Sequence, residues 1–265
     1  MGKQTALITG ASGGIGKELA KVFAENDFNL VLVARSETKL AALKKELVEK
    51  HGVRVTVILQ DMTEGNATDK IVKQLGEANI QVDVLVNNAG FGDNAGFLDS
   101  NWEKQKQMVE LNILALMRMT YVFGNQMRER GKGRILNLSS LAAFFSGPYM
   151  SVYYASKAFV LSFSEAVGAE LKGTGVTVTA LCPGPTTTGF ESAAGLEGSK
   201  MFTFMKPQTA EAVARSGYKA CIAGKPILYH GAATRLGSFS TRLVPRCLAR
   251  NIAKKINGIP ERKES

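Results

Sequence analysis

Histidine and cysteine are scarce in this sequence of 265 residues. It contains two histidines, His51 and His230, and three cysteines, Cys182, Cys221 and Cys247. Two histidines cannot supply a histidine-rich metal site, and they weaken a Ser-His-Asp hydrolase interpretation. The cysteines are scattered and lack the spacing of metal ligands, so we expect reduced structural thiols and predict no metal site.

Long apolar runs are also missing. No run approaches the ~20 residues that a membrane-spanning helix needs, and no signal peptide is recognisable before the strand-like run that begins at Thr5. Position 6 is alanine, whereas a myristoylation site would have serine or threonine there. Since 45% of the residues are apolar, the chain can still bury a full core. We therefore expect a cytoplasmic protein with a single domain over residues 1–265.

Acidic residues are outnumbered, with 33 Lys and Arg against 23 Asp and Glu and a net charge of +10. The excess is concentrated near the C-terminus. Between Arg235 and Lys263 there are eight Lys or Arg and one acidic residue, Glu261. Such a charge is compatible with nucleic acid, an anionic membrane surface, or an acidic carrier or cofactor.

Strand-like and helical patterns alternate along the chain. The strand-like runs lie at 5–9, 29–34, 54–59, 82–86, 134–139 and 175–181, and the helical patterns at 14–26, 36–50, 64–78, 103–130 and 151–172. This alternation is typical of an α/β fold in which helices cover both faces of a doubly wound parallel sheet, here of about seven strands. After Pro183 we expect a variable substrate-loop and helical region over 191–225, a short strand near "KPILYHG", and a basic C-terminal extension over 232–265.

A glycine-rich segment, "TGASGGIG" at residues 9–16, connects the first strand to the first helix. Gly10 allows a tight turn, Gly14 a close backbone approach to a ligand, and Gly16 close contact between helix and strand. The free N–H groups and the helix dipole at this point favour a pyrophosphate, although an ordinary glycine turn is the alternative. The candidate dinucleotide contacts are Gly10, Ser12, Gly13, Gly14, Ile15 and Gly16.

The glycine spacing and six further motifs resemble the short-chain dehydrogenase/reductase family. Over roughly residues 4–190 these are Asp61 after the third strand, "NNAG" (87–90), Asn112, "NLSS" (137–140), Tyr153-xxx-Lys157 and "PGPTTT" (183–188). The resemblance implies a single-domain Rossmann-type fold. The stretch "YYASKAFVLSFSEAVGAEL" is most similar to the NADP-preferring branch near 17β-hydroxysteroid and very-long-chain 3-oxoacyl reductases, and to bacterial relatives.

The end of the second strand decides between NAD and NADP. Arg35 stands there and no carboxylate occurs before Glu37, which favours NADP(H), because an arginine suits the 2′-phosphate. Gly13 takes the place of a second basic residue that the family often has. Lys17 or Lys39 is either a substitute for it or a solvated helix charge. The resemblance adds cofactor contacts at Asp61, Met62, Asn88, Ala89, Gly90, Tyr153, Lys157, Pro183, Gly184, Thr186 and Thr188.

Two adjacent tyrosines, Tyr153 and Tyr154, lie about one helical turn before Lys157. An ammonium at ~4 Å in an effective dielectric of ~20 contributes ~4 kcal/mol, enough to lower a phenol pKa by up to about three units. This argument does not choose between the two tyrosines. The resemblance selects Tyr153 as general acid/base, Ser140 as the stabiliser of the substrate oxygen, and Asn112 as the support of a proton relay. It leaves Ser139 a structural role and Tyr154 a packing or interface role.

The implied reaction is hydride transfer between NADP(H) and a carbonyl or secondary alcohol. Apolar residues after the strands suggest a hydrophobic substrate, such as a 3-oxoacyl or steroid-like ketone. They are Phe91, Leu141, Phe144, Phe145, Tyr149, Phe190, Met201, Phe202, Phe204 and Met205. The alternative is a regulatory or sensor protein that binds NADP(H) and has little turnover.

Partners are expected at two surfaces. By resemblance, the helical segments 103–130 and 151–172 pair in a homodimer or homotetramer. A basic stripe of Arg242, Arg246, Arg250 and Lys254 either docks on an anionic membrane or an acyl carrier, which would make the protein membrane-peripheral, or is simply solvated. The stripe has no interleaved aromatic residues, so we expect no nucleic acid.

Overall fold

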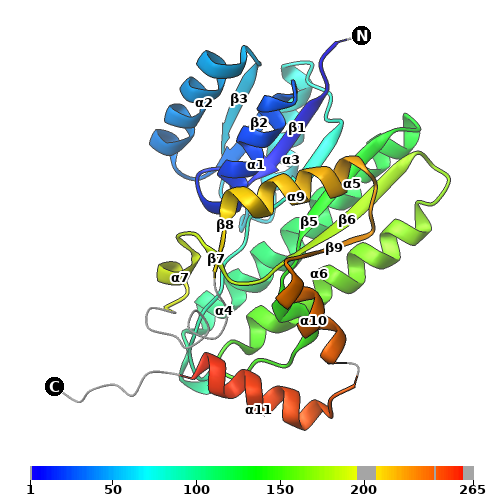
Figure 1. Ribbon diagram of the computed structural model, residues 1–265. Helices are drawn as coiled ribbons and strands as arrows, with labels where there is room; N and C mark the ends of the chain where they lie inside the picture. Colours follow the sequence, from blue (N-terminus) through cyan, green and yellow to red (C-terminus); the bar gives the residue numbers. More distant parts are fainter. Residues whose placement is uncertain (1, 196–206, 242, 259–265) are drawn as a thin grey trace.

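A parallel sheet of seven strands forms the centre of the computed structural model, which describes residues 2–195, 207–241 and 243–258 (Figure 1). The strand order is β3-β2-β1-β4-β5-β6-β9, and all neighbouring strands are parallel. The strands are β1 (Thr5–Thr9), β2 (Asn29–Ala34), β3 (Val55–Leu59), β4 (Val84–Asn87), β5 (Gly133–Leu138), β6 (Val176–Pro183) and β9 (Ile227–His230). The order reverses between β1 and β4, which confirms the predicted doubly wound fold.

Helices cover both faces of the sheet (Figure 1). One face carries α1 (Gly14–Glu25), α2 (Glu37–His51) and α9 (Ala210–Ile222); the other carries α3 (Ala67–Glu77), α5 (Leu116–Glu129) and α6 (Ser151–Glu170). Successive strand side chains point to opposite faces. Ile8 accordingly packs with the first group of helices and Leu7 with the second, and both are fully buried. The continuous apolar strands thus supply two cores.

The predicted helix over 103–130 is not one regular helix. It consists of α4 (Trp102–Val109), a π-helical turn, η2 (Glu110–Ala115), and α5. The π turn widens the backbone, and its single buried side chain is Asn112. Helical periodicity in the sequence did not reveal this turn, because the apolar residues on either side of it still fit a helical pattern.

The predicted variable region 191–225 contains a core helix in its second half. A short helix, α7 (Phe190–Ala193), precedes residues 196–206, which lie outside the described residues, and the two-residue strands β7 (Thr186–Thr187) and β8 (Gln208–Thr209) pair beside it. Helix α9 packs on α1 through Val213, Ala214 and Cys221.

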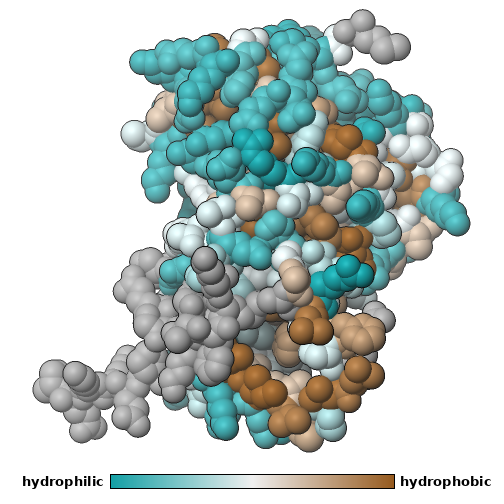
Figure 2. All heavy atoms as spheres, in the orientation of Figure 1, coloured by the Kyte–Doolittle hydropathy of each residue, from teal (hydrophilic) through white to brown (hydrophobic). Residues whose placement is uncertain are grey.

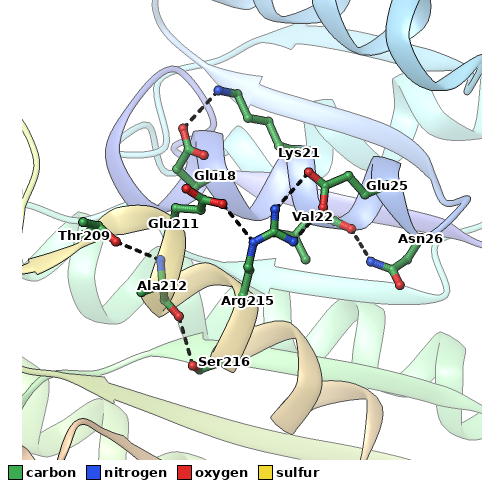
Figure 3. Close-up of polar contacts among 10 residues, drawn as sticks. All are labelled: Glu18, Lys21, Val22, Glu25, Asn26, Thr209, Glu211, Ala212, Arg215 and Ser216. Carbon is green, nitrogen blue, oxygen red and sulfur yellow. Dashed lines mark hydrogen bonds and ion pairs between the residues drawn. The ribbon is translucent and has the colours of Figure 1, made fainter.

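An ion-pair cluster links α9 to α1 at the surface. Arg215 Nη1 donates to Glu25 Oε2 at 2.8 Å, and its Nε donates to Glu211 Oε1 at 2.9 Å (Figure 3). The cluster is exposed, so it orients α9 more than it stabilises the fold.

Two helices form the C-terminal region, α10 (Ala232–Ser240) and α11 (Arg246–Asn257), and both lie beside the carboxyl ends of the strands (Figure 1). Helix α11 packs near the start of α6 through hydrogen bonds described below. Among the described residues, no helix is both long enough and apolar enough to cross a membrane.

Candidate active site

The turn between β1 and α1 requires glycine at three positions. Gly10 and Gly14 have φ of +66° and +53°, a region that disfavours side chains. A Cβ at Gly16 would overlap Asn88 Nδ2 and the carbonyl oxygen of Gly10. Gly13, by contrast, has extended backbone and nothing within 4 Å of a Cβ. The steric reasons predicted for Gly10 and Gly16 agree with this geometry, whereas the close approach of a ligand at Gly14 stays a prediction.

This turn fits the pyrophosphate of a dinucleotide. Helix α1 begins without a side-chain cap and without an acidic residue in its first turn, so its first N–H groups and its positive dipole end remain available. A Cβ at Gly14 would lie 3.3 Å from Thr188, which shows how closely the two segments approach here. Ser12 is half-buried in the turn, whereas the Ile15 side chain packs into the core, leaving only its backbone for a ligand.

Arg35 and Asp61 lie together at the ends of β2 and β3. Arg35 Nη1 is 3.5 Å from Asp61 Oδ2, and the Arg35 side chain is 78% exposed. Burial alone would raise the Asp61 pKa, but hydrogen bonds from Thr63 and the charge of Arg35 lower it below the usual value. Asp61 is therefore a fixed carboxylate, and Arg35 keeps most of its donors free. The Met62 side chain is buried in the core, so only its backbone faces this region.

The segment after β4 is fastened to the glycine turn by hydrogen bonds. Asn88 Nδ2 donates to the carbonyl oxygens of Thr9 at 2.9 Å and Gly10 at 3.2 Å. The backbone N–H groups of Asn88 and Ala89 donate to Thr9 Oγ1 at 3.0 and 3.1 Å. These bonds join the segment after β4 to the turn after β1, and no short motif in the sequence points to Thr9 as a partner.

Asn112 connects this segment to α6. Its Oδ1 accepts from the Phe91 N–H at 3.1 Å, and its Nδ2 donates to the Phe91 carbonyl at 3.0 Å and to Ser156 Oγ at 3.0 Å. Ser156 Oγ in turn donates to the Tyr153 carbonyl at 2.7 Å. Gly90 lies against the Asn112 side chain, because a Cβ added at Gly90 would be 2.9 Å from Asn112 Oδ1. The π turn brings this amide to the base of the candidate site.

Tyr153 and Ser140 meet at the carboxyl end of β5. Burial raises the pKa of Tyr153 to about 12, and a hydrogen bond with the Ser140 side chain partly opposes that rise. Ser140 Oγ also accepts from the Ala142 N–H at 3.1 Å, which fixes the hydroxyl at the start of η3 (Leu141–Phe144). Ser139 points the other way and donates to the Lys157 carbonyl at 2.9 Å, as its predicted structural role requires.

Lys157 is buried one helical turn after Tyr153. Its Nζ donates to the Leu138 carbonyl at 2.8 Å and lies 5.8 Å from the centre of the Tyr153 ring. Burial lowers the pKa of Lys157 to about 8. Burial dominates the Tyr153 pKa here, and the expected lowering of that pKa by Lys157 stays a prediction.

The turn after β6 approaches the glycine turn. Pro183 ends β6, and Thr186 Oγ1 donates to the Gly184 carbonyl at 2.9 Å. Thr188 Oγ1 accepts from the Phe190 N–H at 3.1 Å, and its methyl group lies against Gly14. Two motifs that lie far apart in the sequence therefore meet beside the candidate site.

Only some of the apolar residues predicted to line a pocket lie near Tyr153. The Phe190 ring is 5.2 Å from the Tyr153 ring, and Phe145 belongs to the same cluster. Phe144 instead packs on Tyr229, with ring centres 5.6 Å apart, and Lys254 Nζ lies 6.0 Å from the centre of the Tyr149 ring. Met201, Phe202, Phe204 and Met205 lie outside the described residues.

Tyr154 turns away from Lys157 toward the C-terminal helix. Its hydroxyl donates to Asn257 Oδ1 at 3.0 Å, and Asn257 Nδ2 donates to the Pro148 carbonyl at 3.1 Å. Burial raises the Tyr154 pKa, and the hydrogen bond with Asn257 partly opposes this rise. No short motif in the sequence signals this contact, because the partners are 103 residues apart.

The arrangement places a neutral phenol, a hydroxyl and a buried amine at one edge of the sheet, next to a turn that fits a pyrophosphate. Such a phenol can donate a proton to an oxygen, and the hydroxyl can hydrogen-bond to the same oxygen as its charge develops. The phenol and the amine come from α6, and the hydroxyl comes from the segment after β5.

Comparisons with known proteins agree with this geometry. The short chain dehydrogenase family matches residues 4–199. Ketoacyl reductase HetN of Nostoc sp. is 35% identical over 181 residues, which cover 68% of this chain and 63% of HetN. The human 17-beta-hydroxysteroid dehydrogenase type 3 is 38% identical over 183 residues, which cover 68% of this chain and 58% of that protein. The match thus spans less than two thirds of these curated relatives.

Solved structures extend the similarity over nearly the whole chain. A short-chain dehydrogenase from Sphingobium yanoikuyae in complex with NADPH has a TM-score of 0.80 and 29% identity, covering 99% of this chain and 98% of that one. A bulky-bulky ketone specific alcohol dehydrogenase from Comamonas testosteroni has a TM-score of 0.77 and 27% identity, covering 100% and 98%. By fold and by sequence, the chain belongs to the short-chain dehydrogenase/reductase family.

Proposed function

We propose that the protein is an NADP(H)-dependent oxidoreductase that interconverts a carbonyl and a secondary alcohol on a hydrophobic substrate. The observation that carries this proposal is the meeting of Tyr153, Ser140 and Lys157 beside a turn with the steric form of a dinucleotide site. Membership of the family supports it.

Each member of the group has a role that follows from its surroundings. Tyr153, neutral at pH 7, donates a proton to the carbonyl oxygen during reduction, and Ser140 donates a hydrogen bond to that oxygen. Lys157 binds the ribose and keeps a positive charge near the phenol at neutral pH. Asn112 positions Tyr153 through Ser156 and supports the path by which the proton is replaced.

The cofactor contacts follow the three segments that meet at the turn. NADP(H), when bound, supplies the hydride and, in its oxidised form, a positively charged ring. We assign the pyrophosphate to the turn from Gly10 to Gly16 and the 2′-phosphate to Arg35, whose donors are largely free. Asp61 with the Met62 backbone is assigned to the adenine, and Asn88, Ala89 and Gly90 to the neighbouring ribose. The nicotinamide is assigned to Pro183, Gly184, Thr186 and Thr188.

A hydrophobic ketone is the substrate class that the surroundings of Tyr153 favour. Phe190, Phe145 and Met150 pack about its ring and offer no charged group to a sugar or an acid. The Comamonas testosteroni dehydrogenase, described as specific for bulky-bulky ketones, supports this choice. A 3-oxoacyl or a steroid-like ketone would fit the same description.

NADPH oxidation against a panel of carbonyl compounds tests the proposal. The panel should contain bulky alkyl–aryl ketones, 3-oxoacyl thioesters, steroidal ketones and, as polar controls, ketoses. We expect turnover with at least one hydrophobic ketone and none with the ketoses. Tight NADPH binding without oxidation across the whole panel would instead favour the alternative, a sensor protein that binds the cofactor and has little turnover.

A further inference from the structure

Large apolar side chains are exposed on the two C-terminal helices and on the segment that joins them. Leu236 and Phe239 of α10 are 71% and 56% exposed, Leu243 is 74% exposed, and Leu248 and Ile252 of α11 are 50% and 47% exposed. Figure 2 shows apolar residues gathered over this lower part of the molecule. Soluble proteins rarely expose so many large apolar side chains together, and such patches mark interaction surfaces.

The orientation of α11 produces the outer part of this patch. Ala253 and Asn257 are buried, and Asn257 is held by Tyr154 and Pro148. Leu248 and Ile252, four residues apart, therefore share the face turned away from the protein.

The two described arginines of the predicted basic stripe face the other way. Arg246 and Arg250, with Ala249, line a groove of about 610 Å³ between α11, the 143–148 segment and the start of α6. Arg242 lies outside the described residues. The outer surface of α11 is consequently apolar at its centre, with the lysines of its last turns beside it.

The same segment is strongly positive. Residues 232–257 contain no Asp or Glu and six basic residues, Arg235, Arg242, Arg246, Arg250, Lys254 and Lys255. Arg242 aside, these side chains have no acidic partner within the described part of the chain, although ion pairs are frequent elsewhere on the surface. An occupant of this surface must accept both exposed apolar side chains and an uncompensated positive charge.

A second copy of the chain does not meet that requirement. A symmetric contact through this surface would bring two positive segments together, and like charges at an interface are unfavourable. An anionic bilayer meets both conditions, because its acyl region accepts leucine and phenylalanine side chains while its headgroups attract lysine and arginine.

We propose that the outer face of α10 and α11 is a membrane-binding surface that lies on anionic bilayers without crossing them. Leu236, Phe239, Leu243, Leu248 and Ile252 enter the boundary between headgroups and acyl chains. Lys254, Lys255 and Arg235 pair with lipid headgroups. This proposal does not depend on the proposed reaction, because it concerns a different surface.

Co-sedimentation of the full chain with vesicles tests the proposal. Vesicles of phosphatidylcholine alone are compared with vesicles that contain about one third phosphatidylglycerol. We expect partitioning onto the anionic vesicles to be at least about tenfold stronger, and to weaken with added salt. Equal partitioning onto both vesicles, or onto neither, would overturn the proposal.

Two matched pairs of variants separate the apolar and the charge contributions. Leu236→Gln/Leu243→Gln should lower partitioning at least about tenfold, whereas Val48→Gln/Leu59→Gln, at exposed apolar sites on α2 and β3, should leave it unchanged. Lys254→Glu/Lys255→Glu should lower it similarly, and the adjacent exposed lysines of α2 provide the control Lys44→Glu/Lys45→Glu. Helices α2 and α11 lie at opposite ends of the molecule (Figure 1). A larger loss of partitioning in the C-terminal variant than in its control supports the membrane-binding surface. Equal losses in variant and control refute it.

Cys247 offers a readout that does not rely on sedimentation. It is exposed on α11, whereas Cys182 and Cys221 are buried, so an environment-sensitive fluorophore can be attached to it selectively. We expect a blue shift of its emission on addition of anionic vesicles and none with neutral ones. If light scattering instead shows that Leu236→Gln/Leu243→Gln lowers the oligomeric mass while the wild type binds no vesicles, the surface contacts a second copy and the membrane proposal fails.

Discussion

Burial acts on Tyr153 and Lys157 in opposite directions, and both effects favour the neutral group. The pKa of the phenol rises to about 12 and that of the amine falls to about 8. At pH 7 the pair is therefore a neutral phenol beside a mostly protonated amine. A neutral phenol can donate a proton at once, which suits reduction of a carbonyl. Oxidation requires the phenolate and hence an additional positive charge at the site.

From the lowered Lys157 pKa we predict how the stability of the folded state changes with pH. Between about pH 8 and pH 10.5 the unfolded chain binds the lysine proton and the folded chain does not, so the lysine makes the folded state more stable as the pH rises. We expect the free energy of unfolding of the wild type, relative to Lys157→Met, to increase by about 3 kcal/mol across this range. Denaturant unfolding of both proteins at several pH values measures it. A constant difference would show that the buried amine has an ordinary pKa.

From the position of Arg35 we predict that this residue sets the preference for NADPH over NADH. Its side chain is mostly exposed and paired only at 3.5 Å, so it can turn to a phosphate at little cost. Arg35→Ser should weaken NADPH binding about 10–100-fold and leave NADH binding nearly unchanged, since only NADPH carries the 2′-phosphate. Titration calorimetry with both nucleotides measures this, with Lys44→Ser on α2 as the control. Equal losses for both nucleotides would contradict the assignment.

At the scale of elements, contacts within the turn between β1 and α1 leave room for a side chain at some glycines and not at others. Gly16 lies against Asn88 and Gly10, and Thr9 joins the turn to the segment after β4. Gly13 occupies the same motif but has open space around it. The motif therefore contains both essential and replaceable glycines.

Replacing each glycine by alanine separates these two kinds. Gly16→Ala should lower the free energy of unfolding by about 1–3 kcal/mol and weaken NADPH binding, because the new Cβ displaces Asn88. Gly13→Ala should change the free energy of unfolding by no more than about 0.5 kcal/mol. Denaturant unfolding and NADPH titration of both variants measure the effects. Similar stability of the two variants would contradict the close contact at Gly16.

Periodicity and apolar runs predicted the elements well, because the strands are buried on both faces. The predicted bounds of β1 and β2 are confirmed without change, and those of β3 differ by one residue. The π turn at Asn112 was not predicted, because its irregularity lies in the backbone and not in the order of apolar residues.

The candidate site was predictable only where its residues belong to short motifs. Tyr153, Ser140 and Lys157 fall within such motifs, and the structure brings them together. The Lys157–Leu138 hydrogen bond and the Tyr154–Asn257 hydrogen bond depend on tertiary packing, which no local pattern encodes. Burial likewise decides the Tyr153 pKa, and spacing along a helix cannot predict burial of the hydroxyl.

At the scale of the whole molecule, exposed apolar side chains occur on several surfaces. One is the proposed membrane surface, and Phe97, Leu98 and Trp102 are exposed at and just before the start of α4. Another surface follows η2 and α5, where Leu114, Met117 and Tyr121 are exposed at helical spacing. This η2 and α5 surface agrees with the homodimer or homotetramer that we expect for the pair of helical segments 103–130 and 151–172.

Light scattering tests that expectation. We predict a dimeric or tetrameric mass for the wild type and a smaller mass for Met117→Glu/Tyr121→Glu, since two buried carboxylates in each subunit would oppose the contact. Leu236→Gln, on the other surface, should leave the mass unchanged. A monomeric wild type, or loss of mass in the Leu236 variant alone, would contradict this use of the α5 face.

The most direct measurement compares two neighbouring phenols. Once a ketone substrate has been found, Tyr153→Phe should lower the rate of NADPH oxidation about 10²–10⁴-fold while NADPH affinity stays within a few-fold of wild type, because only the proton donor is removed. Tyr154→Phe, which loses a hydrogen bond to Asn257 instead, should keep most of the turnover. Near-normal turnover in Tyr153→Phe, or an equal loss in both variants, would contradict the assignment of Tyr153 as the acid.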